Sequence, residues 1–448
     1  NKRPIMKLNN KFNSIMLALL ASCSGLALQS CEDEPDKFEL TSGKPTVFYI
    51  RPANVEAKDS LLTSAAPSKT ICIVGKNLTS ISEMFFNDQS TILNTSYITD
   101  NTMIVDVPKE IPNRVTDKIY MVTSKKDTVT YDFHVTIPAP VVDAMSCEFA
   151  KAGEEVTVSG NYLIDDPAVP ITVTLPDGQT VTDFTKKTRT TLTFVMPDCQ
   201  KEGPLTVTSV YGKTESKFHY LESRGMLFDF DGKTGLGNHG WHAATITEDE
   251  TSITGKFLQL GDGVTALDDD TWSEGTFSFE YWPGEWTTPV SYIKGQSEPL
   301  TDLVDFTNYQ KMAFKFEVYV PTSNPWSNLA MQIIPSALTD VTCTGAGVDV
   351  YGNNVPGANT TYFQNDVLPR ALWRPWQETG SYDTGGKWVT VTIPMEDIKY
   401  GMTGVAATGS LSAKSFAGLE LFVMGGGITG KSCKPIIKID NIRAVPIK

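Results

Sequence analysis

The sequence predicts an all-β protein, with two tandem Ig-like β-sandwiches followed by a larger C-terminal β-sandwich of jelly-roll type. Short runs rich in Val, Ile and Thr recur between turn residues, as in "TVFYI", "KTICIVG" and "TLTFVMP". Such runs are typical of sandwich strands, and helical periodicity is nearly absent. An internal repeat occupies the first half of the chain. All eight tryptophans lie beyond that repeat.

Length and composition limit the functional classes. The chain has 448 residues, of which 40% are hydrophobic and 20% are charged, so several domains with sizeable cores are expected. The formal net charge is -14. This argues against a nucleic-acid partner, because binding phosphates requires clustered Lys and Arg.

Residues 1–31 are expected to be a lipoprotein signal peptide. Lys7 and Lys11 precede the apolar run "IMLALLASCSGLAL", which is the pattern of an export signal. The run ends in "LQSC", which resembles a bacterial lipobox and predicts lipidation of Cys31. "LASC", ending at Cys23, is a weaker competitor, and a secreted protein with an unmodified cysteine is the alternative. The following "EDEPD" resembles the surface-export signal of Bacteroidetes lipoproteins, within a linker of residues 32–44.

Residues 45–138 and 139–222 form the repeat. "ICIVGKNL" matches "VTVSGNYL", and "MIVDVP" matches "LTFVMP". The interval from Gly75 to Phe133 is 58 residues, and so is that from Gly160 to Phe218. Two strand sets in one register indicate two similar small sandwiches. They resemble IPT/TIG Ig-like modules, and we expect them to act as spacers because neither contains tryptophan.

Residues 223–448 are too long for one more Ig unit and predict a single larger sandwich. In "KMAFKFEVYVP" the apolar residues from Met312 to Val320 alternate, as in a strand with one buried face. In "TFSFEYW" the residues Phe277, Phe279 and Tyr281 share one face. Trp282 then continues the opposite, polar face, which is expected to contact water.

The predicted binding site is a set of loop tryptophans. Trp282 and Trp286 flank a Pro-Gly turn. Further along the chain, three tryptophans and a neighbouring arginine lie in segments rich in Pro, Gly, Ser and Asn: Trp326, Trp373, Arg374 and Trp376. We expect these rings to be partly exposed.

The remaining three tryptophans are not assigned to the binding site. Trp388 begins the regular strand "WVTVTIP" and is expected to belong to the scaffold. Trp241 and Trp272 are assigned to neither group.

Exposed aromatic rings beside planar polar groups suit a sugar polymer. A flat ring covers the apolar face of a pyranose, while polar groups bond its hydroxyls. Covering roughly 100 Å² at about 25 cal/mol per Å² contributes ~2.5 kcal/mol per stacked sugar. The alternative is that the tryptophans pack the ends of the sandwich.

A catalytic reading has less support. Carboxylates are plentiful, but hydrolysis needs two of them opposed across the scissile bond, which spacing cannot show. No G-x-S-x-G, H-E-x-x-H or P-loop pattern is present. Asp229 and Asp231 in "DFDG", together with Asp440, have the oxygen ligands that suit a structural calcium ion. A simple acidic turn is the alternative, and no cofactor is expected.

The order of these features resembles a cell-surface glycan-binding lipoprotein of a Bacteroidetes polysaccharide-utilisation system. The C-terminal part, from "LFDFDG" through "LPRALWRPW" to "IDNIR", resembles its xyloglucan-binding type of domain. The resemblance implies non-catalytic binding of a β-glucan by residues 223–448 alone, at the outer membrane. It also implies an outer-membrane transporter and its capping lipoprotein as partners. A secreted glycoside hydrolase and a protein-binding adhesin are the alternative functions.

Overall fold

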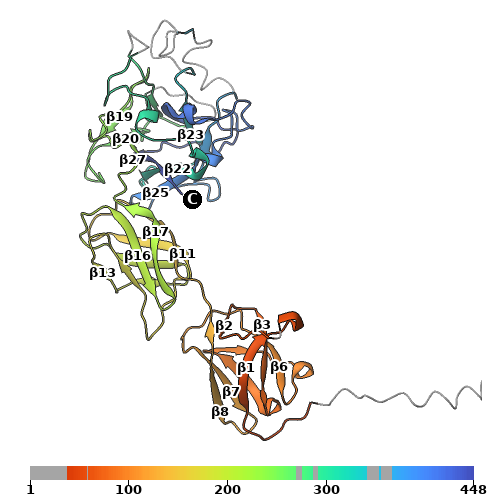
Figure 1. The fold of residues 1–448 in the computed structure, drawn as a ribbon. Helices are drawn as coiled ribbons and strands as arrows, with labels where there is room; N and C mark the ends of the chain where they lie inside the picture. The colour runs from red at the N-terminus through yellow and green to blue at the C-terminus, as the bar shows by residue number, and fades with distance from the viewer. Residues whose placement is uncertain are drawn as a thin grey trace, which may run out of the picture. The chain divides into compact units, whose positions relative to one another are not determined.

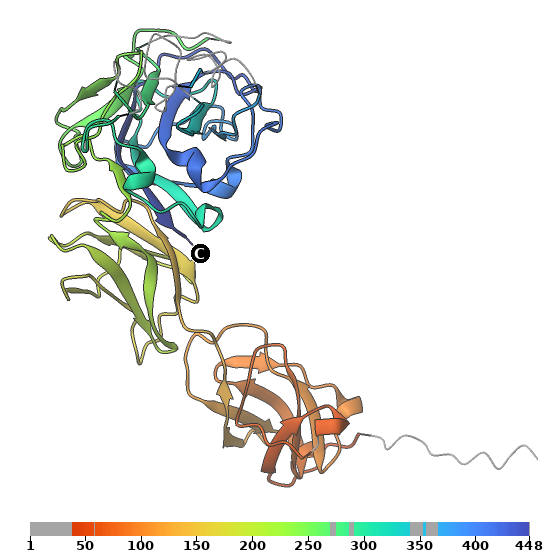
Figure 2. The same ribbon diagram turned by 45° about the horizontal axis from the view of Figure 1, so that its top comes forward.

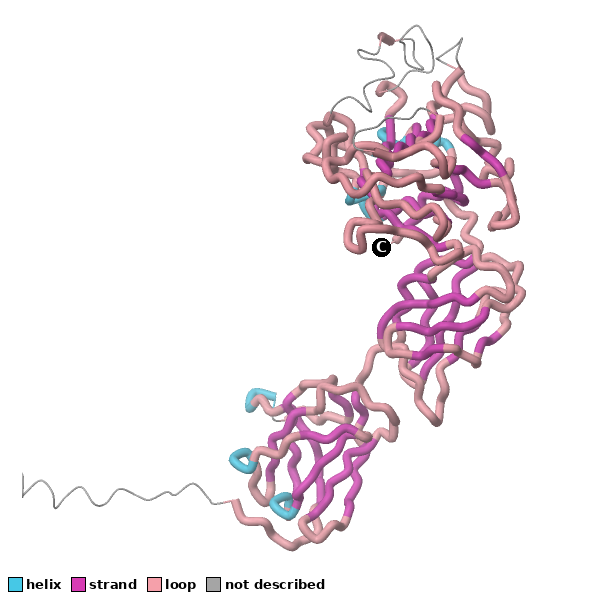
Figure 3. Tube along the Cα trace, turned by 180° about the vertical axis from the view of Figure 1, so that it is seen from behind, coloured by secondary structure: helices cyan, strands magenta, loops and turns pink. Residues whose placement is uncertain are grey.

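The protein is described by a computed structural model that covers residues 38–57, 59–268, 275–285, 291–340, 353–354 and 366–447. The all-β prediction is confirmed (Figures 1 and 3). The helices among these residues are short 3-10 turns, of which Ala413–Phe416 is the longest. None of the described helices is long and apolar enough to cross a membrane. The predicted signal peptide and Cys31 lie outside the described residues.

The described residues divide into two compact units, which lie within residues 1–136 and 137–448. The first unit contains a sheet of order β1-β3-β6, a sheet of order β5-β4-β7-β8, and the parallel pair β2-β9. Its strands are β1 (Thr46–Pro52), β2 (Ser64–Ala65), β3 (Thr70–Lys76), β4 (Ile81–Phe86), β5 (Gln89–Thr91), β6 (Thr102–Asp106), β7 (Lys118–Thr123), β8 (Thr128–Asp132) and β9 (His134–Val135). Short 3-10 turns occur at Val55–Ala57, Leu78–Ser80 and Thr95–Tyr97.

The second unit begins with another pair of sheets, of order β10-β11-β15-β14 and β13-β12-β16-β17. Their strands are β10 (Val141–Met145), β11 (Glu155–Asn161), β12 (Thr172–Thr174), β13 (Thr180–Val181), β14 (Lys186–Lys187), β15 (Thr191–Val195), β16 (Gly203–Ser209) and β17 (Gly212–Tyr220). This Ig-like part repeats the pairing of the first unit, since β11 lies between β10 and β15 as β3 lies between β1 and β6.

The repeated glycines explain why the two sets of strands share a sequence pattern. Gly75 pairs with Val47, and Gly160 pairs with Val142, each beside a register shift in the edge strand. A Cβ atom on Gly75 would lie 2.1 Å from the carbonyl oxygen of Thr46, and one on Gly160 would lie 1.8 Å from the corresponding oxygen of Val141. No side chain fits at that distance, so both repeats require glycine at this position of the strand pair.

The C-terminal sandwich occupies the rest of the second unit. Its larger sheet has the order β19-β20-β27-β22-β25, and β18 also pairs with β27. The strands are β18 (Met226–Phe228), β19 (Thr245–Thr247), β20 (Phe257–Leu260), β22 (Met312–Tyr319), β25 (Val389–Pro394) and β27 (Ile437–Pro446). Segments from both ends of this part of the chain therefore lie in one sheet, as the green and blue ribbons of Figure 2 show.

The smaller sheet of this sandwich has the order β21-β26-β23-β24. Its strands are β21 (Ser278–Tyr281), β23 (Met331–Ser336), β24 (Ala371–Trp373) and β26 (Gly418–Val423). Short 3-10 turns occur at Leu300–Asp302, Tyr309–Lys311, Met395–Asp397 and Ala413–Phe416. Phe279, Phe316 and Leu421 belong to the common core between the two sheets.

The outer face of the larger sheet is buried against the Ig-like part. Trp388 and Phe257 of the sandwich belong to the same apolar cluster as Val156 and Leu205 of that part. The Nε1 group of Trp388 donates to the carbonyl oxygen of Thr251 at 2.6 Å. Trp388 is therefore a packing residue, as expected, but the core that it fills is shared between two segments of the chain.

A buried ion network crosses the same boundary. Glu148 of the Ig-like part accepts hydrogen bonds from Lys315 and from Nη2 of Arg443, the latter at 2.6 Å. Arg443 also donates to Glu317 at 2.9 and 3.0 Å. All four side chains are at most 8% exposed. Strand β22 is thus buried on both faces, whereas its sequence pattern predicts one buried face.

Candidate functional site

An extra bridge extends the smaller sheet beyond β21. The backbone N–H of His239 donates to the carbonyl oxygen of Glu280, and that of Trp282 donates to the carbonyl oxygen of His239, both at 2.8 Å. His239 and Tyr281 form a parallel bridge. The loop that carries Trp241 is therefore attached to the edge of a core strand.

A buried carboxylate fixes this loop. Glu280 is fully buried, and its Oε2 accepts a hydrogen bond from the backbone N–H of Trp241 at 2.7 Å. Its Oε1 lies 2.6 Å from Nδ1 of His242. A Cβ atom on Gly240 would lie 2.3 Å from the Glu280 side chain, so the loop passes directly over the carboxylate. The backbone at Trp241 is thereby held in place.

The indole of Trp241 is half exposed, at 50%. Its ring centroid lies 6.4 Å from that of Trp282, with an interplanar angle of 64°. Trp282 is fully buried and packs with Ile334, Leu368 and Phe422. An exposed ring supported by a buried one and by a fixed backbone is pre-organised to stack on a flat apolar ligand face.

A second exposed aromatic residue lies on the neighbouring loop. Tyr292 is 46% exposed, and its hydroxyl donates to Asp302 at 2.5 Å. It lines a groove of about 560 Å³ together with Asp302, Asp305, Phe306 and Lys414. This groove combines an aromatic wall with charged groups that can bond to hydroxyls. The two segments meet at Gly235 and Gly295, because a Cβ atom on Gly235 would lie 2.3 Å from the carbonyl oxygen of Gly295.

The face of the smaller sheet that includes Glu280 contains further buried polar groups. Glu420 lies opposite Glu280 and accepts a hydrogen bond from Ser336 at 2.8 Å. Burial, reinforced by the charge of Glu280, raises the pKa of Glu420 well above its usual value. Arg370 donates to Gln332 at 2.6 Å, and burial lowers the pKa of Arg370 to about 10. Arg370 also donates to the carbonyl oxygen of Leu368, while Nη2 of Arg370 and Oε2 of Glu420 are buried without a hydrogen-bond partner among the described residues.

The predicted exposure of three tryptophans is wrong. Trp282 and Trp326 are fully buried, and Trp376 is 4% exposed. The Nε1 groups of Trp326 and Trp376 donate to the carbonyl oxygens of Asn328 and Leu329, at 2.5 and 2.8 Å. These loops fold back onto the sandwich, so the rings pack in its interior. They cannot stack on a sugar in this arrangement.

The other predicted site residues are distributed as follows. Trp373 is partly buried, and its ring lies 5.4 Å from that of Trp326 and 5.9 Å from that of Tyr382. Arg374 is partly buried and donates to the carbonyl oxygen of Gly426. Trp286 lies outside the described residues. The structure thus brings Trp326 and Trp373 together, but in a packed aromatic cluster.

Trp241 and Tyr292 were missed by the sequence reasoning. The segment "NHGWHAA" around Trp241 has a glycine before the ring and no strand pattern, which is a weak signal of a loop. Nothing in the local sequence indicates that Glu280, 39 residues away, binds this loop.

The three aspartates suggested for calcium have mostly backbone and hydroxyl partners. Asp229 accepts from the N–H of Lys233 at 3.0 Å, and Asp231 from that of Lys256 at 2.7 Å. Asp440 accepts from the hydroxyl of Thr254 at 2.7 Å. Burial raises the pKa of Asp440 to about 8, and the charges of Glu317 and Asp231 add to this effect.

Comparisons with known proteins agree with this architecture. Residues 220–446 match the model of the surface glycan-binding protein B xyloglucan binding domain. The crystal structure of the surface glycan-binding protein PbSGBP-B from Prevotella bryantii is 44% identical, with a TM-score of 0.84. That match covers 91% of this chain and 100% of the other. An IPT/TIG domain-containing protein from Bacteroides ovatus is 28% identical over 156 residues. That alignment covers 34% of this chain and only 31% of the relative's length.

Proposed function

Because this chain belongs to the family of surface glycan-binding proteins with the B-type xyloglucan-binding domain, we propose that it captures a β-glucan polysaccharide without cleaving it. Binding is assigned to the C-terminal sandwich. A xyloglucan-type chain is the first candidate ligand, in view of the matched domain. The Ig-like parts, which contain no tryptophan, separate the binding surface from the membrane.

The observation that carries the proposal is the exposed ring of Trp241 on its buried support. The backbone N–H of Trp241 is bonded to the buried Glu280, and its ring contacts the buried Trp282. A ring fixed in this way loses little conformational freedom when a sugar stacks on it. The groove beside Tyr292 offers polar side chains that can bond to hydroxyl groups of the bound polysaccharide.

The two carboxylates that face each other in the smaller sheet are not placed for hydrolysis. Glu280 and Glu420 lie directly opposite each other, but both are fully buried. Glu280 binds the Trp241 loop, and Glu420 binds Ser336. A hydrolase must place two carboxylates on either side of a bound glycosidic bond. These two instead maintain the internal structure of the sandwich.

The cellular setting is part of the same proposal. Lipidation of Cys31 anchors the mature chain to the outer membrane, and the acidic residues after it direct it to the cell surface. An outer-membrane transporter and its capping lipoprotein then receive the captured polysaccharide. The support for this setting is the signal-peptide pattern together with the family.

Affinity electrophoresis of the mature chain through gels that contain different polysaccharides tests the proposal. We expect retention by a β-glucan and no release of reducing sugar. Trp241→Ala should weaken binding by about 2 kcal/mol, or roughly 30-fold. Tyr97→Ala is a matched control, because Tyr97 is 59% exposed in the first unit. Absence of retention by any glycan, or release of sugar, would contradict the proposed function.

A further inference from the structure

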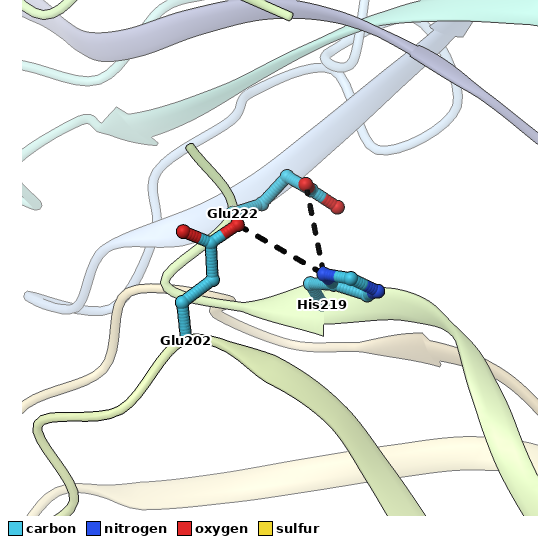
Figure 4. A group of neighbouring side chains, drawn as sticks. All are labelled: Glu202, His219 and Glu222. Carbon is cyan, nitrogen blue, oxygen red and sulfur yellow. Dashed lines mark ion pairs between the residues drawn. The ribbon is translucent and has the colours of Figure 1, made fainter. Parts of the chain in front are cut away.

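A histidine and two glutamates converge where the Ig-like part joins the C-terminal sandwich. Glu202 directly precedes β16, His219 lies near the end of β17, and Glu222 follows β17 by two residues. In the β16–β17 pair His219 is opposite Pro204, which places it beside Glu202. Figure 4 shows both carboxylates turned toward Nδ1 of His219.

The distances are slightly longer than those between ligands of one metal ion. Nδ1 of His219 lies 3.9 Å from Oε1 of Glu202 and 3.9 Å from Oε1 of Glu222. These separations are too long for hydrogen bonds. Two atoms bonded to one tetrahedral zinc ion at about 2.0–2.2 Å lie about 3.3–3.6 Å apart, so each pair would have to close by about 0.3–0.6 Å around an ion. Among the residues that the structure describes, this is the group of three whose ligand atoms all lie within 4.8 Å of one another.

The ring nitrogen is an independent indication. Nδ1 of His219 is buried and has no hydrogen-bond partner within the described part of the chain. A buried nitrogen without a partner is costly, and most such groups are satisfied in native structures. Here the atom faces two carboxylate oxygens that are too far away to satisfy it directly, so a bound cation would complete its contacts.

Neighbouring groups orient both carboxylates. Arg224 donates to the two oxygens of Glu222 at 2.5 and 2.7 Å. Ser223 donates to the two oxygens of Glu202, from its N–H at 3.1 Å and from its hydroxyl at 2.5 Å. Such bonds fix the direction of metal ligands. With a neutral imidazole, the two carboxylates and Arg224 leave one uncompensated negative charge, which favours a cation.

We propose that Glu202, His219 and Glu222 bind a divalent transition-metal ion of the zinc class. Imidazole and carboxylate ligands suit zinc and its first-row neighbours better than calcium, which prefers oxygen alone. The ion would connect the β16–β17 hairpin to the segment that leads into β18, and so stabilise the junction between the Ig-like part and the sandwich. This inference is independent of glycan binding.

Calorimetric titration of the metal-free mature chain with Zn²⁺ tests the proposal, and absorption spectra with Co²⁺ report the ligands. We expect one equivalent to bind and to raise the melting temperature. His219→Ala and Glu202→Gln should each weaken binding by about tenfold or more. His134→Ala is the matched control, since this histidine pairs with Asp117 in the first unit and should leave binding unchanged.

The outcomes are distinct. Stoichiometric binding that is lost in His219→Ala but kept in His134→Ala supports the site. Binding that survives in His219→Ala, or binding at millimolar metal only, overturns it. Circular dichroism of each variant without metal shows whether it is folded, and His219→Gln provides a second test if His219→Ala is not. If no metal binds, and His219→Ala changes only how the melting temperature depends on pH, a proton and not a metal ion occupies the position. The proposal then fails.

Discussion

Glu148→Ala is expected to destabilise the second unit by about 3–5 kcal/mol. Glu148 is 1% exposed and accepts hydrogen bonds from Lys315 and Arg443. After its removal Arg443 retains Glu317 at 2.9 and 3.0 Å, whereas Lys315, itself 7% exposed, loses its acidic partner. Removing one member of a buried ion network typically costs this amount, because the remaining charge stays buried and unpaired.

Tryptophan fluorescence during urea unfolding measures this loss selectively. All eight tryptophans lie in the second unit, so the signal does not report on the first. Glu155→Ala is the matched control, since its pair with Lys387, at 3.9 Å, is exposed and should contribute at most about 1 kcal/mol. If Glu148→Ala were no more destabilising than Glu155→Ala, the network would not hold the Ig-like part to the sandwich, and our account of the junction would be refuted.

Three further changes test other parts of the structure. Trp326→Ala should lower the free energy of unfolding in urea by about 3–5 kcal/mol, because the ring is fully buried. The folded fraction should keep its glycan affinity, and a stable variant that has lost binding would contradict this. The pKa of Asp440 is near 4 in the unfolded chain, and burial raises it to about 8 in the folded protein. The free energy of unfolding should therefore fall by up to about 1.4 kcal/mol per pH unit as the pH rises from 4 to 8. Asp440→Asn should therefore be more stable than the parent at pH 8 and equal to it near pH 4, whereas a less stable variant at pH 8, with calcium stabilising the parent, would mean that the carboxylate is ionised on a cation. Cys31→Ala should release the protein from the membrane fraction, and unchanged membrane association would refute lipidation at this residue.

The strand patterns of the sequence predicted the fold class and the core-facing residues. Phe277, Phe279 and Tyr281 face the sandwich core, as their alternation indicates. Gly75 and Gly160 occupy equivalent positions in the two strand pairs, because the close approach of the neighbouring backbone leaves no room for a side chain. The alternation of apolar residues and the position of a required glycine are both visible in a short stretch of sequence, so these features could be predicted.

The opposite faces of the same strands were not predictable in this way. A period of two indicates which residues share a face, but not whether another segment covers it. Trp282 follows a polar row, yet it is buried with Phe422 and Leu368. Turn residues near a tryptophan likewise do not show whether its loop extends into solvent or folds back. The candidate site depends on the contact between Glu280 and the Trp241 loop, which no local pattern contains.

The junction has a consequence for how the binding domain is held. Lys315 and Glu317 lie on the outer face of the larger sheet, where isolated charges would ordinarily contact water, and Glu148 of the Ig-like part completes their network. Trp388 and Phe257 complete an apolar cluster with the same part. A sandwich cut at residue 223 would expose these rings and leave Lys315 without its carboxylate partner. The sequence repeat suggests two equivalent spacers, but the buried contacts make the second Ig-like part a fixed support of the glycan-binding sandwich.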